Sequence, residues 1–250
     1  MSYYKMSVID NKTANVAFDG TIGDDWWDTS AKSAAMFRDE LKELGDVETI
    51  NVSINSPGGS VFDGISIYNM LKNHKATINV SVEGLAASIA SVIAMAGDTL
   101  TMNTGSMLMI HNPWTFTQGN ANELRDTADL LDKLGGNAID IYSKRTGIDD
   151  ATIQSIMDAE TWLTADEAVD QGWADSINEQ PAVAASIDKS IVKTWQNMPD
   201  KFTAEVEAEE IVPEETPINK YDEAFRKGLQ DRIADIEFNQ KEIKKYGNTI

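Results

Sequence analysis

Two residues of this chain have the types and the local settings that nucleophilic catalysis requires. Ser88 stands where an alternating apolar and polar segment gives way to a run of small residues. A strand turning into a helix there would expose the hydroxyl, and the free N–H groups of the helix start would face a developing oxyanion. His111 follows a short apolar run and precedes Asn112-Pro113, which favours a turn. Either residue alone is also typical of a structural role, but together they predict a serine nucleophile, Ser88, with His111 as its general base.

Two backbone N–H groups are candidates for holding an oxyanion. The N–H of Ile89 would open the helix that follows Ser88. The sequence Ser56-Pro57-Gly58-Gly59 interrupts an earlier alternating segment, and adjacent glycines allow a backbone to present N–H groups to a ligand. We therefore expect Gly59 to supply the second donor, with an ordinary tight turn as the alternative interpretation.

Two acidic residues, Asp158 and Glu160, lie in a segment where a carboxylate would be available to orient a histidine. Either could hold the Nδ1 proton of His111, and either could equally be surface charge in so acidic a chain. The second histidine, His74, lies in a polar segment at the end of an expected helix, where solvent exposure and the helix dipole account for it.

The elements that must position these residues follow an α/β pattern. Glycine turns separate strands from helices twice in succession, at residues 56–59 and again at Gly84, which we expect to break its strand. Residues 1–20 read as one or two opening strands. Further strands are expected at 48–55, 77–83, 99–102 and 107–110. Helices are expected at 29–44, 61–72, 88–96, 122–145, 149–158 and from Thr164, which begins a capping box. Asp28, Thr29 or Ser30 would cap the first helix.

Composition excludes several classes of function. The chain has 250 residues and a formal net charge of −20, which disfavours nucleic acid and anionic membranes as partners. It has no cysteine, so a thiol nucleophile, disulfides and thiolate metal sites are excluded, in keeping with a reducing cytoplasm. Two histidines are too few for a zinc site built from several of them. We expect no metal and no organic cofactor.

The sequence also lacks several signals. Residues 1–11 have no long apolar run of the kind found in secretory signals, and no segment approaches the roughly 20 apolar residues of a membrane helix. The GxxxxGK[ST] pattern of an ATP-binding loop does not occur, so any unfolding of large substrates would need another protein.

The composition changes after Asn178, which predicts three parts. Residues 1–178 would form the main domain, residues 179–218 an acidic and flexible linker, and residues 219–250 a helical tail. The tail has one apolar stripe at helical spacing and would need a partner surface. Its members are Tyr221, Phe225, Leu229, Ile233 and Ile236.

Order and spacing make these separate signals specific. Gly58-Gly59, the turn from Gly84 to Ser88, the segment Met109-Ile110-His111-Asn112-Pro113 and the segment from Leu163 to Asp175 strongly resemble the ClpP peptidase family. The resemblance covers about Glu48 to Asn178 well, the N-terminal segment weakly and the tail not at all. It implies a ClpP/crotonase-like fold of repeated β-β-α units with a C-terminal extension.

The resemblance also implies roles for individual residues. Ser88 matches the family's nucleophile, His111 its base, and Gly59 and Ile89 its backbone oxyanion donors. The third member, usually Asp in the family, falls on Glu160, and a carboxylate one methylene longer can still hold an imidazole. Asp158 is the alternative. The implied activity is that of a serine endopeptidase acting on peptide or protein substrates.

The resemblance further implies an assembly and a biological setting. The family forms heptameric or stacked rings that enclose a chamber, and residues 122–145 look like the long helix that joins opposing rings. The segment Gly20 to Trp27, the Glu160-Thr161-Trp162 variant and the acidic extension resemble ClpP-like proteases of tailed phages and prophages. Those proteases are associated with capsid (prohead) maturation, so capsid or scaffold proteins and a separate unfoldase are candidate partners, in the cytoplasm of a bacterial host.

Two further function classes remain open. A non-catalytic, ring-forming assembly protein would use the acidic tail to recruit partners. An enoyl-CoA hydratase-like enzyme of the same fold superfamily would use backbone oxyanion donors on a thioester, but would not need Ser88, His111 and a following acid in this order. A Ser/Lys protease of the signal-peptide-peptidase type has no convincingly placed lysine.

Overall fold

The computed structural model describes residues 3–23, 33–181, 195 and 197. The central element of the described chain is one mixed sheet of eight strands, in the order β1-β2-β3-β4-β5-β8, with β6 pairing to β4 and β7 to β6. The pairs β1–β2 and β6–β7 are antiparallel and the others parallel. The strands are β1 Tyr4–Val8, β2 Thr13–Asp19, β3 Thr49–Ser56, β4 Thr77–Ala87, β5 Thr99–Thr104, β6 Met107–Ile110, β7 Thr161–Thr164 and β8 Ser176–Pro181.

Six helices accompany the sheet in the described part of the chain. They are α1 Ala34–Glu43, α2 Val61–Lys72, α3 Ile89–Ala94, α4 Ala121–Thr146, α5 Asp150–Asp158 and α6 Ala165–Asp170. Strands and helices alternate from β3 to α3, as the glycine turns predicted, and the α/β fold class is confirmed. Strands β7 and β8 were not expected.

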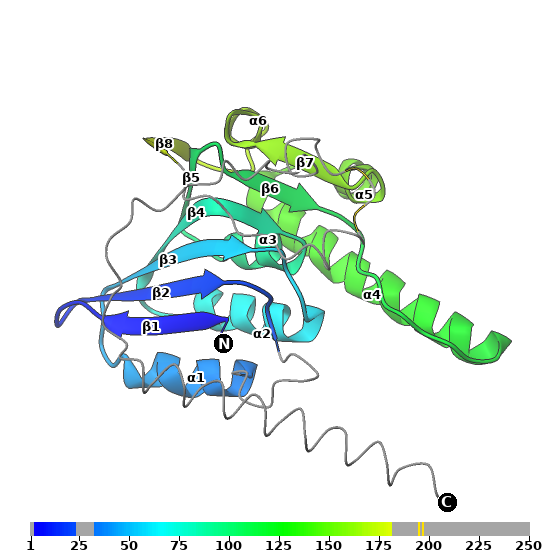
Figure 1. Cartoon of the computed structure of the whole chain (residues 1–250), viewed down its shortest axis with the longest axis horizontal. Coiled ribbons are helices and arrows are strands. Elements are labelled where there is room, and N and C mark those ends of the chain that lie inside the picture. The colour runs from blue at the N-terminus through cyan, green and yellow to red at the C-terminus, as the bar shows by residue number, and fades with distance from the viewer. Residues whose placement is uncertain (1–2, 24–32, 182–194, 196, 198–250) are drawn as a thin grey trace, which may run out of the picture. The chain divides into compact units, whose positions relative to one another are not determined.

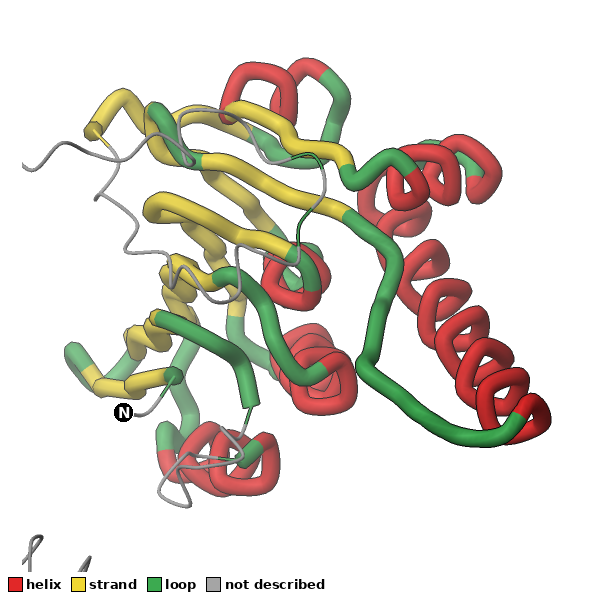
Figure 2. The backbone as a smooth tube through the Cα atoms, turned by 45° about the vertical axis from the view of Figure 1, so that its right-hand side comes forward, coloured by secondary structure: helices red, strands yellow, loops and turns green. Residues whose placement is uncertain are grey.

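The two faces of the sheet differ in chemistry. Along β3, Ile50, Val52 and Ile54 are buried on the face that α1, α2 and α3 cover (Figures 1 and 2). On the opposite face, asparagine side chains form a ladder across β2, β3 and β4, with Nδ2 of Asn51 donating to Asn15 Oδ1 at 3.2 Å and Nδ2 of Asn79 donating to Asn51 Oδ1 at 3.3 Å. Alternation at period two therefore fixes which side of the sheet the helices cover.

Strand β4 changes partner halfway along its length. Its first half pairs with β5, over Asn79 to Val82, and its second half pairs with β6, over Leu85 to Ala87. The expectation that Gly84 breaks this strand is wrong, because the strand continues for eleven residues through the glycine. The residues after Gly84 are buried between neighbours, and this pairing outweighs the weak strand preference of glycine.

The helix expected at residues 29–44 begins later. It starts at Ala34, and the hydroxyl of Ser33 accepts the N–H of Met36 as its N-cap. The candidates Asp28, Thr29 and Ser30 lie outside the described residues. The capping box of Thr164 and Glu167 is present at the start of α6, as predicted.

Helix α4 has two halves with different surroundings. Its second half packs on the domain through Leu134 and Tyr142, whereas its first half extends beyond the sheet and is mostly exposed (Figure 1). The loop of residues 111–120 runs out from β6 to the start of this helix (Figure 2). The predicted linker begins inside β8, and most of it lies outside the described residues, as does the predicted tail.

A buried hydrogen bond joins α3 to α4. The hydroxyls of Ser91 and Tyr142 lie 2.8 Å apart, and Ser91 Oγ also donates to the carbonyl of Ser88 at 2.6 Å. Tyr142 is 1% exposed and Ser91 fully buried, so neither hydroxyl has access to bulk water. Burial raises the pKa of Tyr142, which keeps its hydroxyl a donor.

This arrangement predicts unequal costs for removing the two hydroxyls. Ser91→Ala leaves the Tyr142 hydroxyl buried without its partner, which should lower the free energy of unfolding by about 1–3 kcal/mol. Tyr142→Phe should cost less, about 0.5–1.5 kcal/mol, because Ser91 keeps the Ser88 carbonyl as its acceptor. Urea unfolding of both variants and of the double variant measures the difference. A larger loss for Tyr142→Phe than for Ser91→Ala would contradict this account.

Candidate active site

Ser88 occupies a strained turn between β4 and α3. Its backbone has φ 56° and ψ −130°, a region that non-glycine residues seldom adopt and that costs on the order of 1–3 kcal/mol. The Ser88 N–H donates to the Met109 carbonyl at 2.9 Å, and the Ser88 carbonyl accepts from the N–H of Ser91, also at 2.9 Å. Its side chain makes no capping hydrogen bond to α3. Hydrogen bonds to the N–H and the carbonyl of Ser88 thus hold the turn, and helix capping does not occupy the Ser88 hydroxyl.

His111 lies directly opposite that hydroxyl. It follows β6, whose parallel pairing with the end of β4 brings the two strand ends together. The distance between His111 Nε2 and Ser88 Oγ is 2.8 Å, which is short enough for direct proton transfer. His74, in contrast, lies at the end of α2, where its Nδ1 accepts the N–H of Ala76 at 3.1 Å.

The surroundings of His111 favour its neutral form. Burial lowers its pKa below the ordinary value of 6.5, and the carboxylate of Glu160 acts in the opposite direction. A neutral imidazole at pH 7 has the lone pair that a general base needs. The opposing effect of Glu160 would stabilise an imidazolium at this position.

The two candidate acids occupy different environments. Glu160 is 8% exposed, has a positive φ of 46° and interacts electrostatically with His111. Asp158 is exposed, and its Oδ1 accepts from Asn112 Nδ2 at 2.8 Å and from Gln154 Nε2 at 2.7 Å. The hydrogen bonds from Asn112 and Gln154 lower the pKa of Asp158. Of the two acids, the structure therefore brings Glu160 toward His111.

The glycine turn passes against Ser88 at van der Waals distance. A Cβ atom on Gly58 would lie 2.6 Å from the Cβ of Ser88, at a φ of 96° that side chains rarely adopt. Gly59 forms a parallel bridge with Ile22, in which the Ile22 N–H donates to Gly58 and its carbonyl accepts from Ser60. In a parallel bridge the paired residue directs its own N–H to the other side. The Gly59 N–H is therefore directed away from Ile22.

The N–H of Ile89 is the other expected donor. Ile89 is the first residue of α3, directly after Ser88, where helix N–H groups have no acceptor within the helix. Gly58 and Ile89 are adjacent in space, since a Cβ on Gly58 would lie 3.2 Å from the Ile89 nitrogen. The two candidate donors thus come from segments that meet beside the Ser88 hydroxyl.

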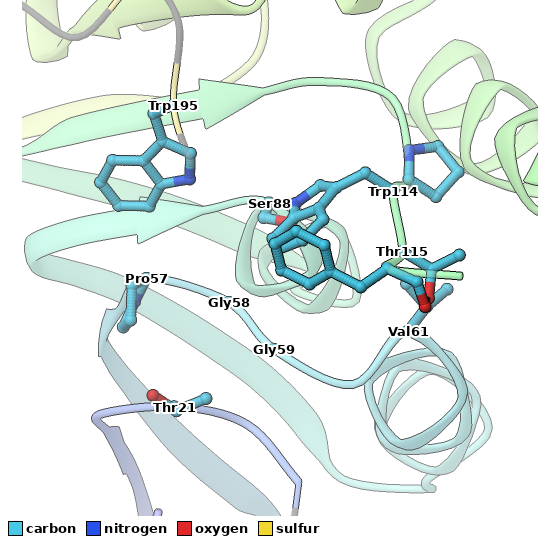
Figure 3. Close-up of a pocket in the computed structure, with 11 residues that line it drawn as sticks. Thr21, Pro57, Gly58, Gly59, Val61, Ser88, Trp114, Thr115 and Trp195 are labelled. Atoms are coloured by element: carbon cyan, nitrogen blue, oxygen red, sulfur yellow. The ribbon is translucent and has the colours of Figure 1, made fainter. Parts of the chain in front are cut away.

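A cleft of about 450 Å³ opens over Ser88. In Figure 3, Trp195 and Pro57 lie on one side of Ser88, and Trp114 and Thr115 lie on the other. The exposed rings of Trp114 and Phe116 contact each other edge to face, with centroids 5.2 Å apart. A smaller, mostly apolar pocket lies beside Ser88 and His111, lined in part by Ile65, Val92 and Leu134. The cleft over Ser88 is thus bordered largely by apolar and aromatic side chains.

Sequence reasoning missed four residues of this site. Trp114 and Phe116 follow the His111-Asn112-Pro113 turn, and two aromatic residues in a polar loop were a usable signal. Trp195 and Asn197 reach the site from the C-terminal side of β8, and no local pattern marks them.

Neither a metal-binding cluster nor a membrane-spanning helix is found in the described part of the chain. No group of three or more His, Cys, Asp or Glu residues is placed there to hold a metal ion. No helix there is both long and apolar enough to cross a bilayer.

Comparison with known proteins identifies the family. The family model for Clp protease matches residues 27–181. A Clp protease proteolytic subunit 1 of Salinibacter ruber is 32% identical over 139 residues, covering 55% of this chain and 60% of that protein, which is less than two thirds of its length. A proteolytic subunit of Bacteroides fragilis is 30% identical over 164 residues, covering 65% of this chain and 78% of that protein. A proteolytic subunit 1 of Chlamydia abortus is 35% identical over 156 residues, covering 58% of this chain and 80% of that protein.

The match to the family model spans the segments that carry Ser88, His111 and Glu160. The mixed α/β fold also agrees with the one that the resemblance to the ClpP peptidases predicted. On the extent of the family match and the coverage of these relatives, the chain belongs to the Clp protease family.

Proposed function

We propose that this chain is a serine endopeptidase with Ser88 as nucleophile, His111 as general base and Glu160 as the acid that orients the base. The observation that carries the proposal is the 2.8 Å contact between Ser88 Oγ and His111 Nε2 at a strained strand-to-helix turn. The relatives named as Clp protease proteolytic subunits support the same chemistry.

The proposed reaction is acyl transfer through a covalent intermediate. Ser88 Oγ attacks the carbonyl carbon of a peptide bond while His111 Nε2 takes the hydroxyl proton. The N–H groups of Gly59 and Ile89 hold the oxyanion of the tetrahedral intermediate. His111 then returns the proton to the departing amine, and an ester to Ser88 remains. Water, deprotonated by His111, hydrolyses the ester and releases the second product.

Glu160 acts on the base and not on the substrate. Its carboxylate stabilises the imidazolium that forms when His111 is protonated, and it selects the tautomer with the Nε2 lone pair toward Ser88. The chemistry requires no metal and no organic cofactor. Asp158, whose carboxylate is engaged by Asn112 and Gln154, is the less suitable acid.

The proposal predicts that a fluorophosphonate forms one adduct, on Ser88. Ser88→Ala should abolish the adduct and lower peptide turnover by on the order of 10⁶, and His111→Ala should abolish labelling because the hydroxyl loses its base.

Since only neutral His111 can accept the proton, the labelling rate should rise with pH and be half-maximal below pH 6.5. Peptide mass mapping and labelling rates across pH measure both effects.

Glu160→Gln provides the control for the acid. The Glu160 charge raises the pKa of His111, so its loss should move the midpoint of the labelling rate against pH to lower pH. The labelling rate at high pH should fall at least about tenfold. Asp158→Asn should leave both unchanged. An adduct that survives His111→Ala would overturn the mechanism. The absence of any adduct on the folded wild-type chain would favour a non-catalytic assembly protein or a hydratase-like enzyme.

We also propose that the chain works as a homo-oligomeric ring, with the first half of α4 in a contact between copies. That half exposes Leu124 and Leu130, and Phe116 is 86% exposed in the loop before it. Apolar side chains on a projecting helix are costly to leave in water and are typical of an interface. A ring would also restrict the active site to unfolded chains, delivered by a separate ATP-driven unfoldase.

This assembly predicts that Leu130→Glu lowers the mass of the complex. The side chain is exposed in the single chain, so folding should be retained while a charge is placed in the interface. Asn137→Glu adds the same charge on the half of α4 that packs on its own domain and serves as control. Native mass spectrometry distinguishes the outcomes. A wild-type chain that is monomeric at micromolar concentration, or a Leu130→Glu ring of unchanged mass, would refute the assignment.

The biological setting that we propose is the maturation of a phage capsid in the bacterial cytoplasm, by trimming capsid or scaffold proteins. The support is the resemblance of the Glu160-Thr161-Trp162 segment and of the acidic extension to ClpP-like proteases of tailed phages. The net charge of −20 fits protein substrates better than nucleic acid or an anionic membrane surface.

Co-production with the capsid and scaffold proteins of a tailed phage that encodes such a chain tests this setting. The full chain should shorten one of these proteins, and Ser88→Ala should not. A chain ending at Thr203 should still be labelled on Ser88 but should lose the trimming, because residues 204–250, which this truncation removes, are the segment that we propose docks the capsid or scaffold substrate. Intact capsid and scaffold proteins beside a labelled wild-type enzyme would eliminate the capsid role and leave the peptidase proposal standing.

A further inference from the structure

Two residues beyond the part of the chain that matches the Clp protease family lie at the candidate active site. The match ends at residue 181, whereas Trp195 lines the cleft over Ser88 and Asn197 contacts Glu160. They come from the segment that composition alone described as a flexible linker. Both nevertheless make specific contacts with the domain.

Asn197 holds the turn that carries Glu160 by two hydrogen bonds. Its main-chain N–H donates to Glu160 Oε1 at 2.7 Å, and its side-chain Nδ2 donates to the carbonyl of Ala159 at 2.8 Å. Glu160 has a positive φ of 46°, which persists only when surrounding contacts compensate for its cost. Asn197 supplies two of those contacts.

Trp195 lies in an apolar cluster beside the candidate site. It is 8% exposed and packs with Leu85, Ala87, Met107 and Met109, which belong to the ends of β4 and β6. Its ring meets that of Trp162 edge to face, with centroids 5.1 Å apart, and Trp162 Nε1 donates to the same Oε1 of Glu160 at 3.5 Å. Burial of an indole of this size stabilises the position of Trp195 against the domain.

We propose that Trp195 and Asn197 are part of the active site, with Asn197 as a positioning residue for Glu160. The inference rests on the proposed role of Glu160. A glutamate has one more rotatable bond than the aspartate usual in the family, so its carboxylate must be fixed by outside contacts. Donors from Asn197 and Trp162 both reach Oε1 of Glu160, and the carboxylate held there interacts electrostatically with His111.

Asn197→Pro tests the main-chain contact directly, because proline has no N–H to donate. Asn197→Ala is the matched control, since it keeps the N–H and removes the side-chain contact with Ala159. Asn197→Pro should lower the rate of fluorophosphonate labelling of Ser88 by about 10- to 100-fold. The pH midpoint of its labelling should move to lower pH, as in Glu160→Gln, whereas Asn197→Ala, which keeps the N–H that Glu160 accepts, should shift both the rate and the midpoint less than Asn197→Pro.

A double variant separates positioning from general damage. If Asn197 acts through Glu160, adding Asn197→Pro to Glu160→Gln should cost no further labelling rate, so the two effects should be strongly non-additive. If the two losses in labelling rate added in full, the proline would be acting on something other than Glu160. An Asn197→Pro chain that labels at the wild-type rate, with the wild-type pH midpoint, would overturn the inference.

Amide hydrogen exchange in the full chain tests the contact without relying on a variant at residue 197. The Asn197 amide should exchange at least about tenfold more slowly than an unprotected amide, and Glu160→Ala should remove that protection. Free exchange of this amide in the wild-type chain would refute the inference even if Ser88 is labelled. A protected amide in a chain that is never labelled would instead refute the proposed peptidase function.

Discussion

The pairing of β6 with the end of β4 is the constraint on which the rest of the site depends. Ser88 has a backbone conformation that costs free energy, and the hydrogen bond from its N–H to the Met109 carbonyl holds it there. The same strand then delivers His111 two residues later, with Nε2 at 2.8 Å from Ser88 Oγ. Because one strand pairing sets both the backbone strain at Ser88 and the position of His111, a slip in the register of that pairing would disturb both together.

The glycine turn at residues 58 and 59 also packs closely against its neighbours, which limits the residue types possible there. Gly58 passes Ser88 so closely that any side chain would collide with it, and Gly59 lies against the backbone of Ile22. The glycines are therefore required by the space available as well as by their positive φ values. The proposed nucleophile, base and backbone donors thus come from segments that parallel strands bring to one edge of the sheet, where α/β folds commonly place their ligands.

Much of this arrangement could be predicted from the sequence, because it depends on local patterns. Alternation located β3 and β4, helical spacing located α2, α4 and α5, and the turn at Ser88 was recognisable from the residues around it. Gly84 was misjudged because the pairing of β4 with β6 is not visible locally. The choice between Asp158 and Glu160 also depended on burial, since two acids so close in sequence look alike until one faces solvent. Trp195 and Asn197 depend on long-range packing, which no periodicity within their own segment indicates.

Glu160 is a largely buried carboxylate, and its burial has to be offset by hydrogen-bond donors. A carboxylate that is 8% exposed loses much of its hydration, and in a chain with a net charge of −20 the surrounding field adds to that cost. The N–H groups of Asn197 and Trp162 offset the lost hydration, and His111 benefits from the remaining charge. The donors that make it possible to bury the acid are thus the same ones that fix its direction. In the proposed arrangement, the longer side chain at this position is therefore held by donors on both sides of the family match, Trp162 inside it and Asn197 beyond its end.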